Sequence, residues 1–204
     1  MVCRVFNAKL AELKEDILKR KVLGRVMAHS YVIEFQKRGL PHVHMVLWLH
    51  EQDAPKKPED VDRFVTAEIP DKETSPLLHE LVKTHMVHGP CKGILTGLDG
   101  PPCWKLRKGG RTASFDDMYC EKDFPKDLCQ HTVFAATGSP VYRRRSPEEG
   151  GHTLELKSRY VKDSSGRSKT ITLDNSWIVP HNRYLSINIK KSCICSYCQF
   201  HEIT

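Results

Sequence analysis

The fold of this 204-residue chain is decided by residues 31–44, which read YVIEFQKRGLPHVH. Residues 26–35 are rich in β-branched and aromatic side chains and predict one strand, and residues 42–49 predict a second. The segment between them contains the turn-forming residues Gly39 and Pro41. Two strands joined by so short a connection form an antiparallel hairpin.

Two histidines alternate with apolar residues along the second expected strand. Because successive side chains of a strand point to opposite faces, His42 and His44 share one face, about 7 Å apart at Cα. On the first strand, Glu34 and Gln36 have the same parity, and either can point to that face. This pattern favours a partial metal site with positions left open for oxygen ligands and water. The alternative is a chance pair of surface histidines.

Further elements follow outward from the hairpin. Residues 4–20 predict an amphipathic helix, and shorter helices are expected from Pro58 and from Pro76, with Ser75 as the N-cap. About fifty residues after Gly89 have little periodicity and predict a loop-rich insert. The remaining strands are expected at residues 140–143, 153–156, 169–173 and 176–179. No repeat or second core is evident, which favours one domain.

The composition narrows the class of partner. The net charge of +7 favours polyanions such as nucleic acid, although it is not diagnostic by itself. No apolar run approaches the length of about 20 residues that a membrane-spanning helix needs, so no membrane partner is expected. The N-terminal residues lack the features of a secretory signal, so the eight cysteines and eleven histidines favour metal ligation over disulfides.

Residues 31–44 closely resemble the signature of the Helitron replication-initiator domain, the Helitron helicase-like N-terminal domain. Five later blocks extend the resemblance: residues 67–71, 85–91, 124–126, 140–145 and 175–180. Helitron initiators look like members of the HUH endonuclease class. The resemblance implies an α+β fold, in which an antiparallel sheet displays His42 and His44 and helices cover its other face. It also implies that these histidines bind Mg²⁺ or Mn²⁺, with Glu34 or Gln36 completing the set.

The reaction implied by the resemblance is phosphodiester transesterification. A divalent ion polarises a phosphate of single-stranded DNA, and a tyrosine attacks it to leave a 5′-phosphotyrosine and a free 3′-hydroxyl. The tyrosine helix of the family has no counterpart after Tyr184, where a divergent Cys-rich tail, residues 190–204, begins. Tyr197 is the one late candidate nucleophile. We therefore expect a truncated domain over residues 1–189 that is inactive in cleavage on its own.

Two more expectations follow from the resemblance. The helicase region of full-length elements is absent from this sequence, which has no GxxxxGK[ST] phosphate loop. A relationship to a eukaryotic DNA transposon implies a nuclear location.

A second constellation of ligands lies in the insert, residues 85–130. The two-residue gap between His88 and Cys91 suits tetrahedral Zn²⁺. The preferred set adds Cys103 and Cys120, because the resemblance implies cysteines at these positions, and leaves His85 as a helix-face residue. The alternative is that these cysteines are small buried hydrophobes. Ligand-like spacing recurs in the tail at Cys193, Cys195, Cys198 and His201.

Basic side chains supply candidate DNA contacts because they can bind phosphate oxygens. The candidates are Lys37, Arg38, Arg143, Arg144 and Arg145. Solvated charge is the alternative use of such runs. Phe35 and Trp48 flank the hairpin and could stack on bases, but core packing is the favoured use. The alternative to metal-dependent DNA binding is a non-catalytic, zinc-stabilised nucleic-acid-binding module. A third hypothesis is that the chain does not fold stably, because an edge of its sheet is left unpaired.

Overall fold

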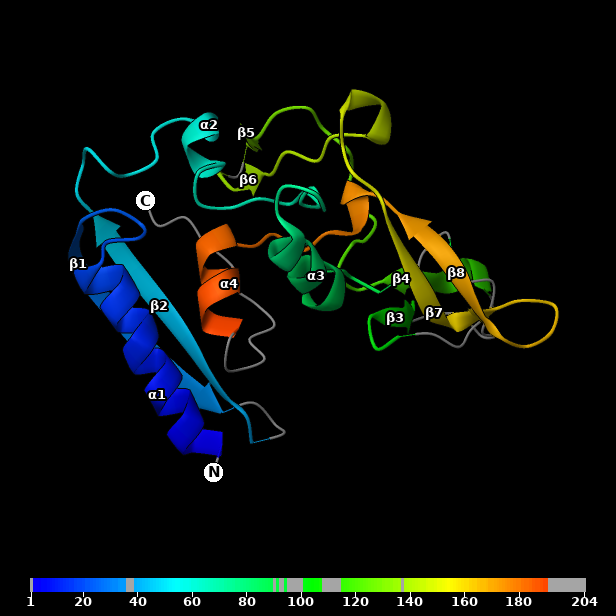
Figure 1. Ribbon diagram of the computed structural model, residues 1–204, viewed down its shortest axis with the longest axis horizontal. Helices are drawn as coiled ribbons and strands as arrows, with labels where there is room; N and C mark the ends of the chain where they lie inside the picture. The colour runs from blue at the N-terminus through cyan, green and yellow to red at the C-terminus, as the bar shows by residue number, and fades with distance from the viewer. Residues whose placement is uncertain are drawn as a thin grey trace. The chain divides into compact units, whose positions relative to one another are not determined.

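The computed structural model describes residues 2–35, 39–89, 91, 94, 101–107, 115–136 and 138–190, without the side chains of residues 159, 189 and 190. The chain divides into two compact units (Figure 1). The first draws on residues 1–66, 132–141 and 181–204, and the second on residues 67–131 and 142–180. The boundary predicted at residue 189 stays a prediction.

The first unit is built around the expected hairpin. Its elements are α1 (Val2–Lys14), the π-helical turn η1 (Glu15–Lys19), β1 (Val26–Phe35), β2 (Pro41–Leu49), α2 (Pro58–Val61), β5 (Val133–Phe134), β6 (Pro140–Val141) and α4 (Arg183–Lys190). Strands β1 and β2 pair antiparallel, as predicted, and so do β5 and β6. The expected helix over residues 4–20 is confirmed as α1 and η1, and its apolar residues Leu10 and Ile17 are buried.

Helix α1 lies along one face of the hairpin (Figure 1). Lys14 Nζ is 4.9 Å from the centre of the Tyr31 ring, a cation–π distance. Tyr31 pairs with Met45, and residues directly opposite one another in an antiparallel pair point to the same face. The helix therefore covers the face that carries Tyr31 and Met45, which is the face opposite to that of His42 and His44.

The open end of the hairpin is fixed by an acidic side chain. Asp53 accepts hydrogen bonds from the backbone nitrogen of Arg25 at 2.8 Å and from its Nε at 2.7 Å. These bonds lower the pKa of Asp53 to about 2. Gly24 has φ +96°, and a Cβ there would lie 2.8 Å from Cβ of Asp53, so glycine is needed where the chain enters β1.

The second unit contains most of the buried apolar residues. Its elements are α3 (Pro76–His85), β3 (Trp104–Leu106), the 3₁₀ turn η2 (Phe115–Asp117), β4 (Met118–Cys120), η3 (Pro147–Glu149), β7 (Leu154–Lys162), β8 (Ser168–Leu173) and η4 (Asn175–Trp177). Its core includes Ala67, Ile69, Leu78, Val82, Leu154, Leu173 and Ile178. The strands expected at 153–156 and 169–173 are confirmed as parts of β7 and β8, which pair antiparallel.

Two local expectations are wrong. Residues 176–179 do not form a strand: Asn175–Trp177 is a 3₁₀ turn, in which Asp174 accepts a hydrogen bond from the backbone nitrogen of Ser176. Of this segment only Ile178 forms a β-bridge, with Val87. Ser75 occupies the N-cap position of α3, yet its side chain makes no capping hydrogen bond.

The mixed helix and antiparallel-strand class is confirmed. Among the described residues the strands are distributed over four two-stranded sheets, β1–β2, β3–β4, β5–β6 and β7–β8. A period-two pattern predicts a strand but not how many strands join it, because that depends on long-range packing. None of the helices in the described ranges combines the length and apolar character required to cross a bilayer.

Candidate metal centres

The first candidate centre is the face of the β1–β2 hairpin opposite to the face that carries Tyr31 and Met45. Glu34 pairs with His42, and Val32 pairs with His44, so the two imidazoles and the carboxylate share one face as predicted. The His42 and His44 rings meet edge to face, with centroids 4.6 Å apart. Nε2 of His44 lies 3.2 Å from Oε2 of Glu34. The two imidazoles are therefore in contact and His44 also contacts Glu34, but within the described ranges the group of three or more metal-ligating side chains that come together is the one at His88, not this one.

The spacing of His44 and Glu34 is compatible with neighbouring ligands of one divalent ion. Adjacent ligands of an octahedral ion with metal–oxygen distances of about 2.1 Å lie about 3.0 Å apart, close to the separation of His44 and Glu34. Both side chains are more than half exposed, so water or substrate oxygens can occupy the other positions. Gln36, the other predicted third ligand, lies outside the described residues, as do Lys37 and Arg38. The choice between Glu34 and Gln36 therefore stays open.

The second candidate centre is a buried cluster in the second unit. Its members are His88, Cys91, Cys103 and Cys120, the set preferred from the sequence, and their ligand atoms all lie within 4.8 Å of one another. Nε2 of His88 is 3.7 Å from Sγ of Cys91 and 3.4 Å from Sγ of Cys120. This cluster could hold a metal ion such as zinc.

Separate parts of the unit position these ligands. The backbone nitrogen of His88 donates to the carbonyl of Trp177 at 2.8 Å, next to the bridge between Val87 and Ile178. Cys103 immediately precedes β3, and Cys120 ends β4. The pairing of Trp104 with Cys120, and the bond from Glu121 nitrogen to the Cys103 carbonyl, hold these two thiols together.

The geometry of the cluster and the neutral state of His88 both suit zinc. With Zn–S near 2.3 Å and Zn–N near 2.0 Å, the edges of a tetrahedral site are about 3.5 to 3.8 Å, close to the two distances from His88. Burial, aided by Lys126 and Lys122, lowers the pKa of His88 to about 4, which keeps the imidazole neutral at pH 7. Its ring stacks on Phe124 with centroids 4.1 Å apart. Burial and the neighbouring Cys120 raise the pKa of Cys103.

The arginine triplet has a structural use that the sequence did not reveal. Arg144 is 4% exposed, and its Nη1 donates to the carbonyls of Asn175 and Ile178 at 2.6 and 2.7 Å. Its guanidinium is therefore not available to a phosphate, which corrects the DNA contact expected for this residue. Arg145 forms a two-bond ion pair with the buried carboxylate of Glu68, which Arg143 also approaches. DNA contacts by Arg143 and Arg145 stay predictions.

The later sequence blocks that carried the resemblance meet around residues 175–180. The Arg144 bonds join block 140–145 to this segment, and Asn175 Oδ1 accepts from the Ile69 nitrogen of block 67–71 at 2.7 Å. Block 85–91 joins it through Met86, whose carbonyl accepts from Val179 nitrogen, and block 124–126 through the bond from Lys126 nitrogen to Ser176 oxygen. These blocks therefore build the frame around the cysteine and histidine ligands.

The aromatic residues of the hairpin are exposed. Trp48 is 48% exposed and Phe35 is 64% exposed, so the expectation that both pack in the core is wrong. Strand composition did predict β1 and β2, but within the described ranges both of these side chains remain largely in contact with solvent. Both side chains are available to a partner.

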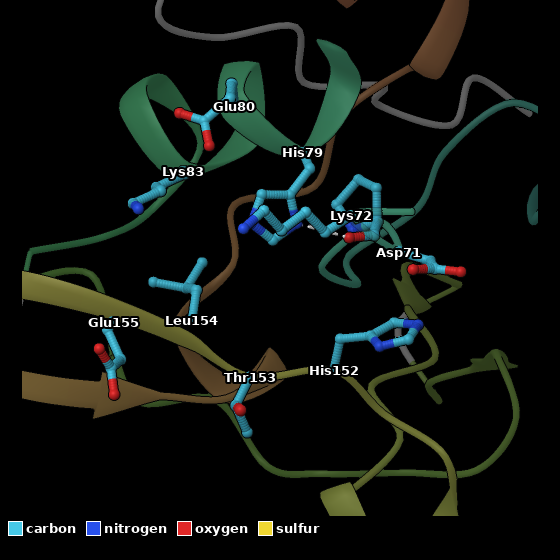
Figure 2. Close-up of a pocket in the computed structure, with 10 residues that line it drawn as sticks. Asp71, Lys72, His79, Glu80, Lys83, His152, Thr153, Leu154 and Glu155 are labelled. Atoms are coloured by element: carbon cyan, nitrogen blue, oxygen red, sulfur yellow. Dashed lines mark hydrogen bonds between the residues drawn. The ribbon is translucent and has the colours of Figure 1, made fainter. Parts of the chain in front are cut away.

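A cavity that sequence reasoning missed lies in the second unit, between α3 and the start of β7. It measures about 300 Å³, and Figure 2 shows His79 projecting into it from α3, toward Leu154. His79 Nδ1 donates to the carbonyl of Pro70 at 2.8 Å, which fixes its tautomer. Lysine and carboxylate side chains both line the cavity, so its charge selects neither an anion nor a cation.

The described tyrosines of the first unit, Tyr31 and Tyr184, are not identified as nucleophiles for the histidine face. Tyr31 lies on the opposite face of the hairpin, and Tyr197, the candidate from the sequence, lies outside the described residues. Tyr184, in α4, interacts with Arg20 and contributes, after Asp16, to raising the pKa of that guanidinium. No residue is therefore assigned to covalent catalysis.

Comparison with known families bears on the first unit. Residues 1–47 match the model of the family described as the Helitron helicase-like domain at the N-terminus. The resemblance inferred from the sequence is thereby confirmed for the segment that contains α1, β1 and the histidines of β2. No curated protein matches the chain.

Proposed function

We propose that this chain is a Helitron-type nucleic-acid-binding protein that holds single-stranded DNA at the β1–β2 hairpin through a divalent cation, Mg²⁺ or Mn²⁺. The observation that supports the proposal is that Glu34, His42 and His44 share one face of the hairpin, with His44 in contact with both of the others. The match of residues 1–47 to a Helitron family supports a transposon-related function, and the net charge of +7 suits a polyanion. Action on nuclear DNA is part of the same proposal.

The side chains have distinct roles in this proposal. A bound divalent cation would neutralise charge on a phosphodiester and polarise its phosphorus–oxygen bonds. His42 and His44 would present neutral imidazole nitrogens to the ion, and Glu34 would supply the negative oxygen ligand. Glu34 and His44 already lie 3.2 Å apart, so only a small rearrangement is needed for both to bind one ion. No cleavage step is assigned, because no tyrosine has been placed beside these groups.

A second candidate function rests on the cysteine and histidine cluster. In this alternative the chain is a non-catalytic nucleic-acid-binding module whose fold depends on zinc held by His88, Cys91, Cys103 and Cys120. The two functions differ in what DNA binding requires. The first needs the hairpin histidines, whereas the second needs only the zinc ligands and a basic surface.

The test measures binding of fluorescein-labelled single-stranded DNA by fluorescence anisotropy, in Mn²⁺ or in EDTA. We expect His42→Ala and His44→Ala each to weaken Mn²⁺-dependent binding at least 10-fold. His29→Ala is the matched control: His29 is an exposed histidine of the same hairpin that pairs with Leu47 on the other face. Binding that survives both substitutions and fails only after zinc removal would replace the first function by the second. A protein–DNA adduct on a denaturing gel would show a covalent cleavage step, which this proposal does not include.

A further inference from the structure

Trp48 lies on the same face of the hairpin as the two histidines. Along that face the paired residues are Glu34 with His42, Val32 with His44, Ser30 with Val46, and Ala28 with Trp48. Directly opposed residues in an antiparallel pair share a face, so these four pairs form one strip. The strip begins at the candidate cation site and ends at the indole.

The indole is exposed in a way that the other tryptophans are not. Trp48 is 48% exposed, whereas Trp104 and Trp177 are 7% and 6% exposed. The residue opposite it, Ala28, is too small to cover a ring of this size. Val32, on the same face, is 53% exposed, so apolar area at both positions is available for contact with a partner.

The chemistry of the strip changes along its length. Glu34 and the histidines supply ligands for a cation at one end, whereas the side chains from His44 onward are small or apolar: Val32, Val46, Ser30, Ala28 and Trp48. None of these carries a charge, so this part of the strip suits the faces of bases rather than phosphates. Trp48 lies four residue steps along the strand from His44, which is about 13 Å. That spans about four nucleotides at the stacked rise of 3.4 Å, and fewer if the strand is extended.

We infer that Trp48 is a stacking platform for a base of the same single strand whose phosphate is held at the histidine pair. This inference rests on the proposed function and adds a specificity to it: the site selects unpaired DNA, because a base inside a duplex cannot offer its face to the indole. Phe35 is excluded from this role, since it pairs with Pro41 and lies on the opposite face.

The first measurement is the intrinsic tryptophan fluorescence of the wild-type protein during titration with oligothymidylate in Mn²⁺. Because Trp104 and Trp177 are buried, a stacked base quenches mainly Trp48, and Trp48→Leu removes most of the quenching. Anisotropy of labelled oligothymidylate measures affinity in parallel. Binding by anisotropy without any quenching would overturn the stacking role and leave the proposed function standing. Absence of binding by the wild-type protein would overturn the proposed function itself.

The second measurement compares variants. Trp48→Leu should weaken single-strand binding about 5-fold to 100-fold, the range for one lost base stack, and Trp48→Phe should recover part of the loss. Phe35→Leu, at an exposed aromatic on the other face, should change affinity less than 2-fold. The salt dependence should be unchanged in Trp48→Leu, because phosphate contacts set counterion release. Equal losses for single-stranded and double-stranded DNA, or equal effects of Phe35→Leu and Trp48→Leu, would overturn the inference.

Discussion

Arg144 Nη1 donates a 2.6 Å hydrogen bond to the backbone carbonyl of Asn175, and Asn175 Nδ2 donates a 2.8 Å bond back to the carbonyl of Arg145. The two residues thereby join two segments that are distant in sequence inside the second unit. Burial lowers the pKa of Arg144 to about 10, so the side chain remains a cation at pH 7. A buried guanidinium is stable only when acceptors bind it, so these hydrogen bonds stabilise the packing of the two segments.

Replacing Arg144 should destabilise the protein without altering how affinity for DNA depends on salt. Lysine keeps the charge but lacks the planar array of donors, so Arg144→Lys should lower the free energy of unfolding by about 2 to 3 kcal/mol in urea denaturation. Arg143→Lys is the control, because its more exposed side chain keeps a cation beside Glu68, and we expect a loss below about 1 kcal/mol. Equal stability of Arg144→Lys and the wild type would contradict the structural role.

The pairing of Glu68 with Arg145 should make stability depend on pH. Burial raises the pKa of Glu68, but hydrogen bonds from Arg145 and the charges of Arg145 and Arg143 outweigh this effect. In the folded protein the pKa of Glu68 therefore lies below its ordinary value of 4.5. The unfolded chain therefore takes up the proton first as pH falls. The stabilisation is present above about pH 4.5 and is lost below it, as the pH falls through the folded pKa.

Urea denaturation at pH 7 and pH 4 measures this effect. At pH 7, Glu68→Gln should have a free energy of unfolding about 2 kcal/mol below that of the wild type. At pH 4 this difference between the two proteins should be smaller. Loss of zinc at low pH affects both proteins, so the comparison between them isolates Glu68. A difference that stays constant from pH 7 to pH 4 would show that the carboxylate charge is not the source of the stabilisation.

Zinc should bind in a one-to-one ratio, and its removal should destabilise the second unit. The four ligands surround one position, and ion binding to the folded state adds about 4 kcal/mol when free zinc exceeds the dissociation constant 1,000-fold. Metal analysis should therefore find one zinc in the wild type and much less in Cys91→Ser or Cys120→Ser.

Cys3→Ser is the matched control for this prediction, because Cys3 is an exposed cysteine of α1 outside the cluster. It should retain both the zinc and the melting temperature of the wild type. Equal zinc content in Cys3→Ser and Cys120→Ser would contradict the assignment of the ligands.

The third ligand of the hairpin site can be identified by substitution. If Glu34 completes the set, Glu34→Gln should weaken Mn²⁺ binding at least 10-fold by isothermal titration calorimetry, because the contact with His44 and the negative charge are both reduced. Gln36→Ala should then have little effect. The reverse result would assign Gln36, and no effect of either substitution would remove the oxygen ligand from the proposed site.

Local signals in the sequence sufficed for the hairpin and the helix before it. β-Branched and aromatic composition on either side of a turn predicted the strands at residues 26–35 and 42–49, and parity placed His42, His44 and Glu34 on one face, as the pairing register confirms. The zinc set was also named in advance, because two of its members are neighbours in sequence and the resemblance implied the others. By contrast, the apolar run at residues 176–179 has strand composition, yet Asp174 and the packing around Asn175 turn it into a 3₁₀ turn.

The sequence by itself determined the β1–β2 hairpin and which of its side chains share a face, and with the resemblance it named the cysteines and histidine that meet, because these depend on the chain's periodicity, composition and motifs. Only the tertiary structure decided that Arg144 is buried and binds backbone carbonyls, that Trp48 remains exposed to water, and that a cavity lies beside His79. The reason is physical: burial and the supply of carbonyl acceptors come from residues far away along the chain, and an arginine or a tryptophan looks the same in sequence whether its neighbours are protein or solvent.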